Sequence, residues 1–233
     1  MKKLISALIV LFGIASVEAQ EVQLLYDFGE DHDYLTSTVQ MFKPDKWGST
    51  FFFIDMNYDA KNASTVSLAY WEIARGLKLG DSKFAAHIEY NGGLLQVNST
   101  PDNKAYSINS SWLGGLEYNM HNADFTKGLT LMAMYKYIKD KNDVSFQLTA
   151  VWYMHILNKK LSFNGFADFW REDNTFYYEE GTAETIYIFL TQPQIWYNFT
   201  SNVSLGSEID FNYNFGGVEG FRANPMVAAK WTF

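Results

Sequence analysis

Cysteine is absent from this 233-residue chain. Its absence excludes disulfides, thiolate metal sites and cysteine nucleophiles. Proline occurs only 4 times, and charged residues make up 19%, below the roughly 25% of a typical globular protein. The formal net charge of -8 argues against a general nucleic-acid binder. Aromatic residues, in contrast, reach 18%, so many rings must lie outside a small closed core.

The first residues have the features of a secretory signal peptide. Met1, Lys2 and Lys3 form a positive start, residues 4–14 are mostly apolar, and 17–19 (VEA) fit a cleavage site. The alternative is a retained anchor helix. After Gln20 no apolar run reaches the 18 residues of a transmembrane helix. We therefore predict a signal peptide over 1–19 and a single domain over 20–233.

The rest of the chain alternates apolar and polar residues with a period of two. In 203–215 one face carries Val203, Ile209 and Phe211, and the other face carries Glu208 and Asp210. Such alternation is typical of strands with one apolar and one polar face. Turn residues separate twelve predicted strands, at 22–29, 34–42, 48–58, 65–79, 83–97, 104–120, 126–139, 143–157, 160–172, 183–199, 202–215 and 220–233.

Two all-β architectures would use twelve amphipathic antiparallel strands. A soluble lipocalin-like barrel turns its apolar face inward, whereas a transmembrane barrel turns it to lipid. The membrane is favoured by the long strands, the even strand number and the C-terminal Phe233, which is typical of bacterial outer-membrane barrels and of the signal that their assembly machinery reads. Aromatic residues at strand ends suit the membrane interfaces: Tyr135, Tyr137, Tyr197, Phe199, Tyr213, Phe215, Trp231 and Phe233.

In the predicted transmembrane antiparallel β-barrel, an up-and-down meander, short turns face the periplasm and longer loops face outward. The connections 43–47 and 121–125 are longer than this rule expects on the periplasmic side. Arg75 is also awkward, because strict alternation directs it to lipid. A bulge near Gly76 or a position at the interface would relieve the cost.

Alternation also predicts which side chains face the lumen. Acids outnumber bases there, so the lumen should suit cationic or neutral solutes. Rings beside carboxylates could stack a nucleoside base and hydrogen-bond its sugar, although in a narrow barrel such groups often only fill the interior. The candidate contacts are Phe51, Phe53, Asp55, Glu72, His87, Glu89, Glu117, Tyr153, Asp168, Trp170, Trp196, Glu208, Asp210 and Arg222; Asp27, Lys78, Lys136 and Lys230 also face inward.

Short segments throughout the chain resemble the outer-membrane nucleoside-specific channel (Tsx-like) family. They include VQLLYDF at 22–28, YLTSTVQMF at 34–42, FFFIDMN at 51–57, YWEIAR at 70–75 and LGGLEYN at 113–119. The resemblance implies a monomeric twelve-stranded barrel in the outer membrane of a Gram-negative bacterium, with a narrow channel for nucleosides. A sister family sharing the barrel and not the substrate is the alternative. No nucleoside-binding residue is transferred by the resemblance.

Other functions have weaker support in the sequence. A hydrolase could use the loop Glu30-Asp31-His32-Asp33 as a carboxylate–imidazole pair, but a short polar loop is more often simply solvated. A receptor or structural barrel without an open pore could use the longest outer loop, 173–182. We predict no enzyme activity, no cofactor and no metal. The expected partners are outer-membrane lipid and a small solute, with no nucleic acid.

Overall fold

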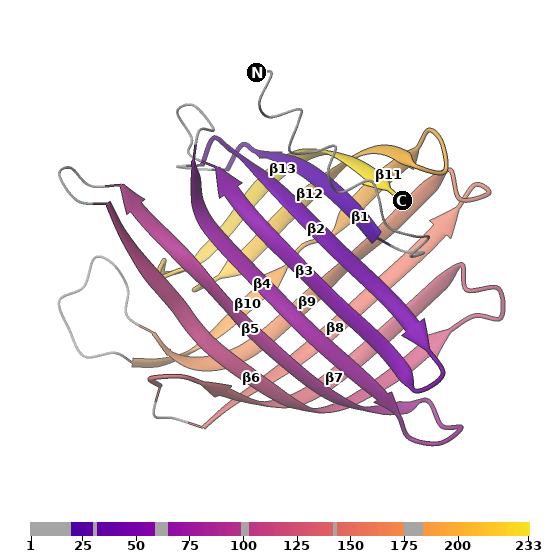
Figure 1. The fold of residues 1–233 in the computed structure, drawn as a ribbon, viewed down its shortest axis with the longest axis horizontal. Helices are drawn as coiled ribbons and strands as arrows, with labels where there is room; N and C mark the ends of the chain where they lie inside the picture. Colours follow the sequence, from indigo (N-terminus) through magenta and orange to yellow (C-terminus); the bar gives the residue numbers. More distant parts are fainter. Residues whose placement is uncertain (1–19, 30–31, 59–64, 99–102, 142–143, 175–183) are drawn as a thin grey trace.

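The computed structural model describes residues 20–29, 32–58, 65–98, 103–141, 144–174 and 184–233. Their strands form one antiparallel sheet that closes into a barrel (Figure 1). None of the described segments is a helix that could cross a membrane. The strands are β1 Gln20–Asp27, β2 Tyr34–Asp45, β3 Gly48–Tyr58, β4 Val66–Lys78, β5 Phe84–Asn98, β6 Asn103–His121, β7 Lys127–Ile138, β8 Ser145–Ile156, β9 Leu161–Asn174, β10 Glu184–Thr191, β11 Gln194–Asn198, β12 Val203–Tyr213 and β13 Phe221–Thr232.

The barrel has the predicted twelve strands, because β10 and β11 occupy one strand position. Both segments pair with β9 on one side and with β12 on the other. The predicted continuous strand 183–199 is wrong at Gln192 and Pro193, where the ladder is interrupted. Proline has no N–H to donate to a neighbouring strand. Pairing of β1 with β13 closes the barrel.

The turns are short at the end of the barrel where the first strand begins and the last strand ends. Phe233 N–H donates to the Gln20 carbonyl there, so β1 and the C-terminus meet at this end, which we expect to face the periplasm. The connection predicted at 43–47 is tighter than expected, since Asp45 pairs with Gly48 around a two-residue turn. The connection after β6 does stay longer, running from Asn122 to Thr126.

The barrel is apolar outside and polar inside. Large apolar side chains are exposed on the outer face, among them Ile73 (58%) and Leu116 (50%). Charged side chains on the opposite face are buried, including Glu89 (8%) and Glu208 (6%). A soluble barrel would have the reverse arrangement, because water-exposed apolar surface is unfavourable. This finding favours the transmembrane barrel over the lipocalin-like alternative.

The aromatic residues predicted at the strand ends lie on the exposed outer surface. All eight retain at least a third of their surface: Tyr135, Tyr137, Tyr197, Phe199, Tyr213, Phe215, Trp231 and Phe233. Rings of this kind are favoured where hydrocarbon meets the polar headgroups. The aromatic excess of the composition is therefore partly accounted for by this outer surface.

Arg75 faces outward, close to the periplasmic end. Its register with Thr50 is regular, so no bulge relieves it. It lies about 10 Å or less from the end of β4, at about 3.3 Å per residue. The guanidinium donates to both Asp45 carboxylate oxygens, at 2.7 and 2.9 Å, and to Thr50 Oγ1 at 2.9 Å. The charge of Arg75 is therefore accommodated by its position near the interface and by its ion pair with Asp45, and not by a bulge.

Some predictions fall on parts of the chain that the structure does not describe. The signal peptide over 1–19 lies outside the described residues, as do Glu30 and Asp31. Most of the loop 173–182 does as well. The signal peptide and the role of that loop therefore stay predictions.

Candidate functional site

The predicted contact residues all lie on the inner face of their strands. Cross-strand partners share a face, and the inner rows run through neighbours such as Phe53 with Glu72, and Glu72 with Asn91. This placement makes them lumenal. Contact with a solute remains a prediction for each of them.

Charged side chains surround the opening of the lumen at the end opposite the periplasmic turns, and Asp27 is one of them. His32 Nδ1 lies 2.5 Å from Asp27 Oδ2, and the Gly29 N–H donates to Asp27 Oδ1 at 2.7 Å. The hydrogen bond to the Asp27 carboxylate raises the pKa of His32 above its usual value, against the opposing effect of burial. The charge of Asp210 raises this pKa more weakly, and that of Arg222 lowers it. This contact joins His32, which precedes β2, to the last residue of β1.

This pair predicts a pH dependence at the outer rim. Because the pKa of His32 is higher in the folded protein than in the unfolded one, this residue contributes to the free energy of unfolding. The contribution is complete below the unfolded-state pKa of about 6.5, and it is lost as the pH rises through the folded-state pKa. Because His32 is partly solvated, the loss should be about 1 kcal/mol or less. Urea unfolding of the wild type should give a lower free energy of unfolding at pH 9 than at pH 6, and His32→Gln should not show this difference. Equal pH dependence in both proteins would contradict this assignment.

Four strands contribute charged side chains to one central acidic cluster, which we define as Glu72, Glu89, Asp168 and Lys136. The charges of Glu89, Asp168 and Lys136 all act on Glu72, although Glu72 is on β4 and Asp168 on β9. These two strands are separated by four others around the sheet. Charges from distant parts of the wall thus influence one another across the interior of the barrel.

Neutral neighbours hold the members of the cluster in place. Tyr70 Oη donates to Glu72 at 2.7 Å, and Thr149 Oγ1 donates to Asp168 at 2.5 Å. Lys136 Nζ donates to Gln147 Oε1 at 2.8 Å and lies 4.5 Å from the centre of the Trp170 ring. The one base of the cluster is therefore fixed by an amide and a ring rather than by a direct ion pair.

His87 connects the cluster to Glu117. Its Nδ1 lies 2.8 Å from Glu117 Oε1 and its Nε2 lies 3.0 Å from Glu89 Oε2. Asn119 Nδ2 also donates to Glu117, at 3.2 Å. These polar contacts brace the wall formed by β5 and β6.

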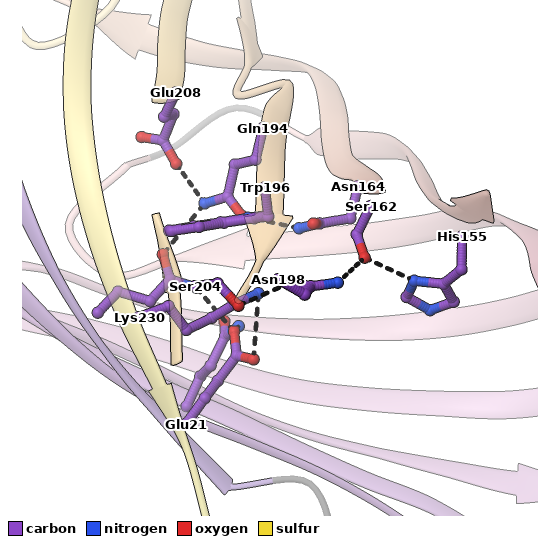
Figure 2. A network of polar contacts seen from close by, with 12 residues as sticks. Glu21, His155, Ser162, Asn164, Gln194, Trp196, Asn198, Ser204, Glu208 and Lys230 are labelled. Carbon is purple, nitrogen blue, oxygen red and sulfur yellow. Dashed lines mark hydrogen bonds and ion pairs between the residues drawn. The ribbon is translucent and has the colours of Figure 1, made fainter. Parts of the chain in front are cut away.

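Nearer the periplasmic end, Gln194 is the centre of a polar network (Figure 2). Its amide nitrogen donates to Glu208 Oε2 at 2.5 Å and to Gln23 Oε1 at 3.3 Å. Its amide oxygen accepts from Asn164 Nδ2 at 2.7 Å and from Trp196 Nε1 at 3.0 Å. One side chain from β11 thus joins β1, β9 and β12.

Lys230 lies beside this network (Figure 2). Its Nζ is 4.3 Å from the centre of the Trp196 ring and 3.5 Å from Glu21 Oε2. A separate chain of hydrogen bonds links Asn198 to Ser162 at 2.9 Å and Ser162 to His155 at 2.8 Å. This level of the lumen is largely occupied by side chains that bind one another.

The predicted aromatic contacts fall into two groups. Trp196 (0% exposed) and Trp170 (6%) are buried, each with a lysine over its ring. Phe51, Phe53 and Tyr153 retain intermediate exposure. Phe53 has ring contacts with Phe51 and with Tyr70, both at 5.9 Å between centroids. Only the second group leaves ring surface available to a solute without rearrangement.

Several lumenal groups are not among the residues predicted from sequence. Glu21 and Gln23 share the inner face with Asp27, and Glu172 accepts a hydrogen bond from Trp170 Nε1 at 2.7 Å. Extending the alternation by two, four or six residues from the predicted positions would have found them. Gln194 was missed because the interruption at Pro193 obscures the phase of its strand.

Within the described ranges, no group of three or more His, Asp or Glu residues could hold a metal ion. The catalytic loop considered from sequence is only partly described, and His32 there is paired with Asp27. The absence of a cofactor and of catalysis therefore stays a prediction.

Comparisons with known proteins agree with this fold. A family model described as "Domain of unknown function (DUF5020)" matches residues 19–233. The NanC porin structure has 11% identity to the chain and a TM-score of 0.57, covering 92% of this chain and 100% of that one. An outer membrane channel of Pseudomonas putida F1 has 11% identity and a TM-score of 0.53, covering 94% and 97%. The search of curated proteins finds no match. The barrel is thus of the outer-membrane type, and a nucleoside-specific channel is not among these two structures.

Proposed function

The chain belongs to the family described as "Domain of unknown function (DUF5020)", and on that premise we propose that it is an outer-membrane channel for passive diffusion of small neutral or cationic solutes. One observation carries the proposal: the lumen is lined by polar side chains in which acids outnumber bases. In the central acidic cluster, the charges of three acids, Glu72, Glu89 and Asp168, act on the single base Lys136. Carboxylates in a narrow low-dielectric passage attract cations and repel anions.

Within that class, nucleosides are our leading candidate. Phe51 and Phe53 offer ring surface to a base, and Asp55, held by Thr38 Oγ1 at 2.5 Å, is the next inward residue on the same strand. Stacking plus hydrogen bonds to hydroxyls is the combination that a nucleoside needs. The tryptophans are less suitable, because lysines cover them.

Planar-bilayer recording tests both the proposed channel and the proposed nucleoside solute. Purified protein should pass a small cation-preferring current, and millimolar uridine or adenosine should reduce it. Phe53→Ala should weaken this block about tenfold, since stacking on one ring contributes about 1–3 kcal/mol, whereas Phe52→Ala, which changes the outward neighbour, should not. A current without block would reject nucleosides and keep the channel.

A receptor or structural barrel without an open pore is the second candidate. The network around Gln194 and the fully buried Trp196 favour it, because they fill part of the lumen. Absence of any conductance from folded, inserted protein would support this candidate over a channel. For either function we propose a monomer whose C-terminal Phe233 is read by the outer-membrane assembly machinery.

A further inference from the structure

Two buried oxygen atoms in the lumen lack hydrogen-bond donors. They are Glu89 Oε1 and Asn91 Oδ1, and they are the two such side-chain atoms found in the described part of the chain. Glu89 is 8% exposed and Asn91 is 4% exposed. Both belong to the inner face of β5, two positions apart, and Asn91 is the direct cross-strand partner of Glu72. One unpaired acceptor therefore belongs to the central acidic cluster, and the other lies directly beside its member Glu72.

Nearby donors are already engaged elsewhere. His87 Nε2 serves the other oxygen of Glu89, at 3.0 Å. Lys136 donates to Gln147 and lies on the Trp170 ring. A buried acceptor without a donor is costly, and a carboxylate oxygen more so. Glu89 Oε1 and Asn91 Oδ1 therefore have no donor of their own.

Lys136 shows which chemistry this part of the lumen accommodates. Its primary ammonium group is held by an amide oxygen at 2.8 Å and lies within the field of Glu72, Glu89 and Asp168. Glu89 and Asn91 offer the same kinds of ligand, a carboxylate and an amide oxygen, and no lysine donates to their free oxygens. An anion would be repelled by the same carboxylates. A divalent metal is disfavoured, because the described residues contain no suitable set of three ligands.

We propose that Glu89 and Asn91 form a binding position for the ammonium group of a small primary amine that enters the lumen. The inference rests on the proposed channel, since it names the solute class that the acidic lumen selects. Binding would satisfy the two free oxygens with N–H donors, and a small side-chain adjustment would admit the ligand. It would also offset the excess negative charge around Glu72.

Thermal unfolding of the detergent-solubilised protein provides a test that does not require conductance. The probes are methylammonium chloride and tetramethylammonium chloride at equal concentration, since both are monovalent and only the first has N–H donors. If methylammonium binds with a dissociation constant of about 10 mM, 0.3 M should raise the Tm by about 3 °C or more over tetramethylammonium. Equal Tm values in the two salts would overturn the proposal.

Variants localise the effect. Glu89→Gln and, separately, Asn91→Leu should remove the difference between the two salts, whereas Asp81→Asn, in the exposed turn after β4, should keep it. If Glu89→Gln fails to fold, Asn91→Leu alone decides, and a retained difference there would reject the site. Bilayer recordings separate the two proposals: a methylammonium-specific Tm shift without any current would refute the channel and leave the binding position standing.

Discussion

Replacing Glu72 by Gln and Asp168 by Asn together should lower the cation preference of the current about fivefold or more. A unit charge about 8 Å from a permeating ion contributes about 2 kcal/mol at an effective dielectric constant of 20. The charges of the two acids act on each other across the lumen, although four strands separate β4 from β9, so we expect a passing ion to experience both. The amides keep the hydrogen bonds from Tyr70 and Thr149, and the wall should stay intact.

Reversal potentials across a KCl gradient measure this preference directly. The effect should be largest at low salt and weaken near 1 M, where the screening length falls to about 3 Å. Asp81→Asn removes one negative charge from an exposed turn and should leave the potential unchanged. An unaltered potential in the double variant would show that the passage does not run through the central acidic cluster.

Gly115→Ala should either keep most of the protein molecules from folding or lower the free energy of unfolding of the barrel by about 3 kcal/mol. A Cβ at Gly115 would lie 2.1 Å from the Ala133 carbonyl oxygen and 2.7 Å from Met134 Cα. Both atoms belong to the backbone of β7, which is paired with β6, so neither moves without disturbing the ladder. Overpacking of rigid neighbours costs about 1–3 kcal/mol, occasionally more.

The adjacent glycine provides the control. A Cβ at Gly114 would have its nearest contact at 4.0 Å, with the His87 carbonyl oxygen, so Gly114→Ala should fold like the wild type. Folding into detergent or lipid vesicles can be followed by urea titration and by the gel mobility of unheated samples. Similar urea midpoints for the two variants would mean that the backbone of β7 is more compliant than the structure indicates.

Sequence periodicity determined most of the fold. Each strand places successive side chains on opposite faces, so alternation alone gave the strands, the inward position of residues such as Glu208 and the outward position of residues such as Tyr197. It failed at Pro193, where the missing N–H interrupts a ladder that the pattern had read as continuous. For Arg75 it offered a bulge or a position at the interface, but it did not identify the partner Asp45, which belongs to a different strand.

Composition and alternation by themselves determined a membrane barrel with an apolar exterior and an acidic interior, because both depend only on residue type and on a period of two. The tertiary structure decided which lumenal groups meet. Sequence distance does not reveal that Glu72 on β4 and Asp168 on β9 act on each other, that lysines cover Trp170 and Trp196, or that oxygens of Glu89 and Asn91 lack donors. Those facts depend on how closing the sheet brings distant strands together around one narrow interior.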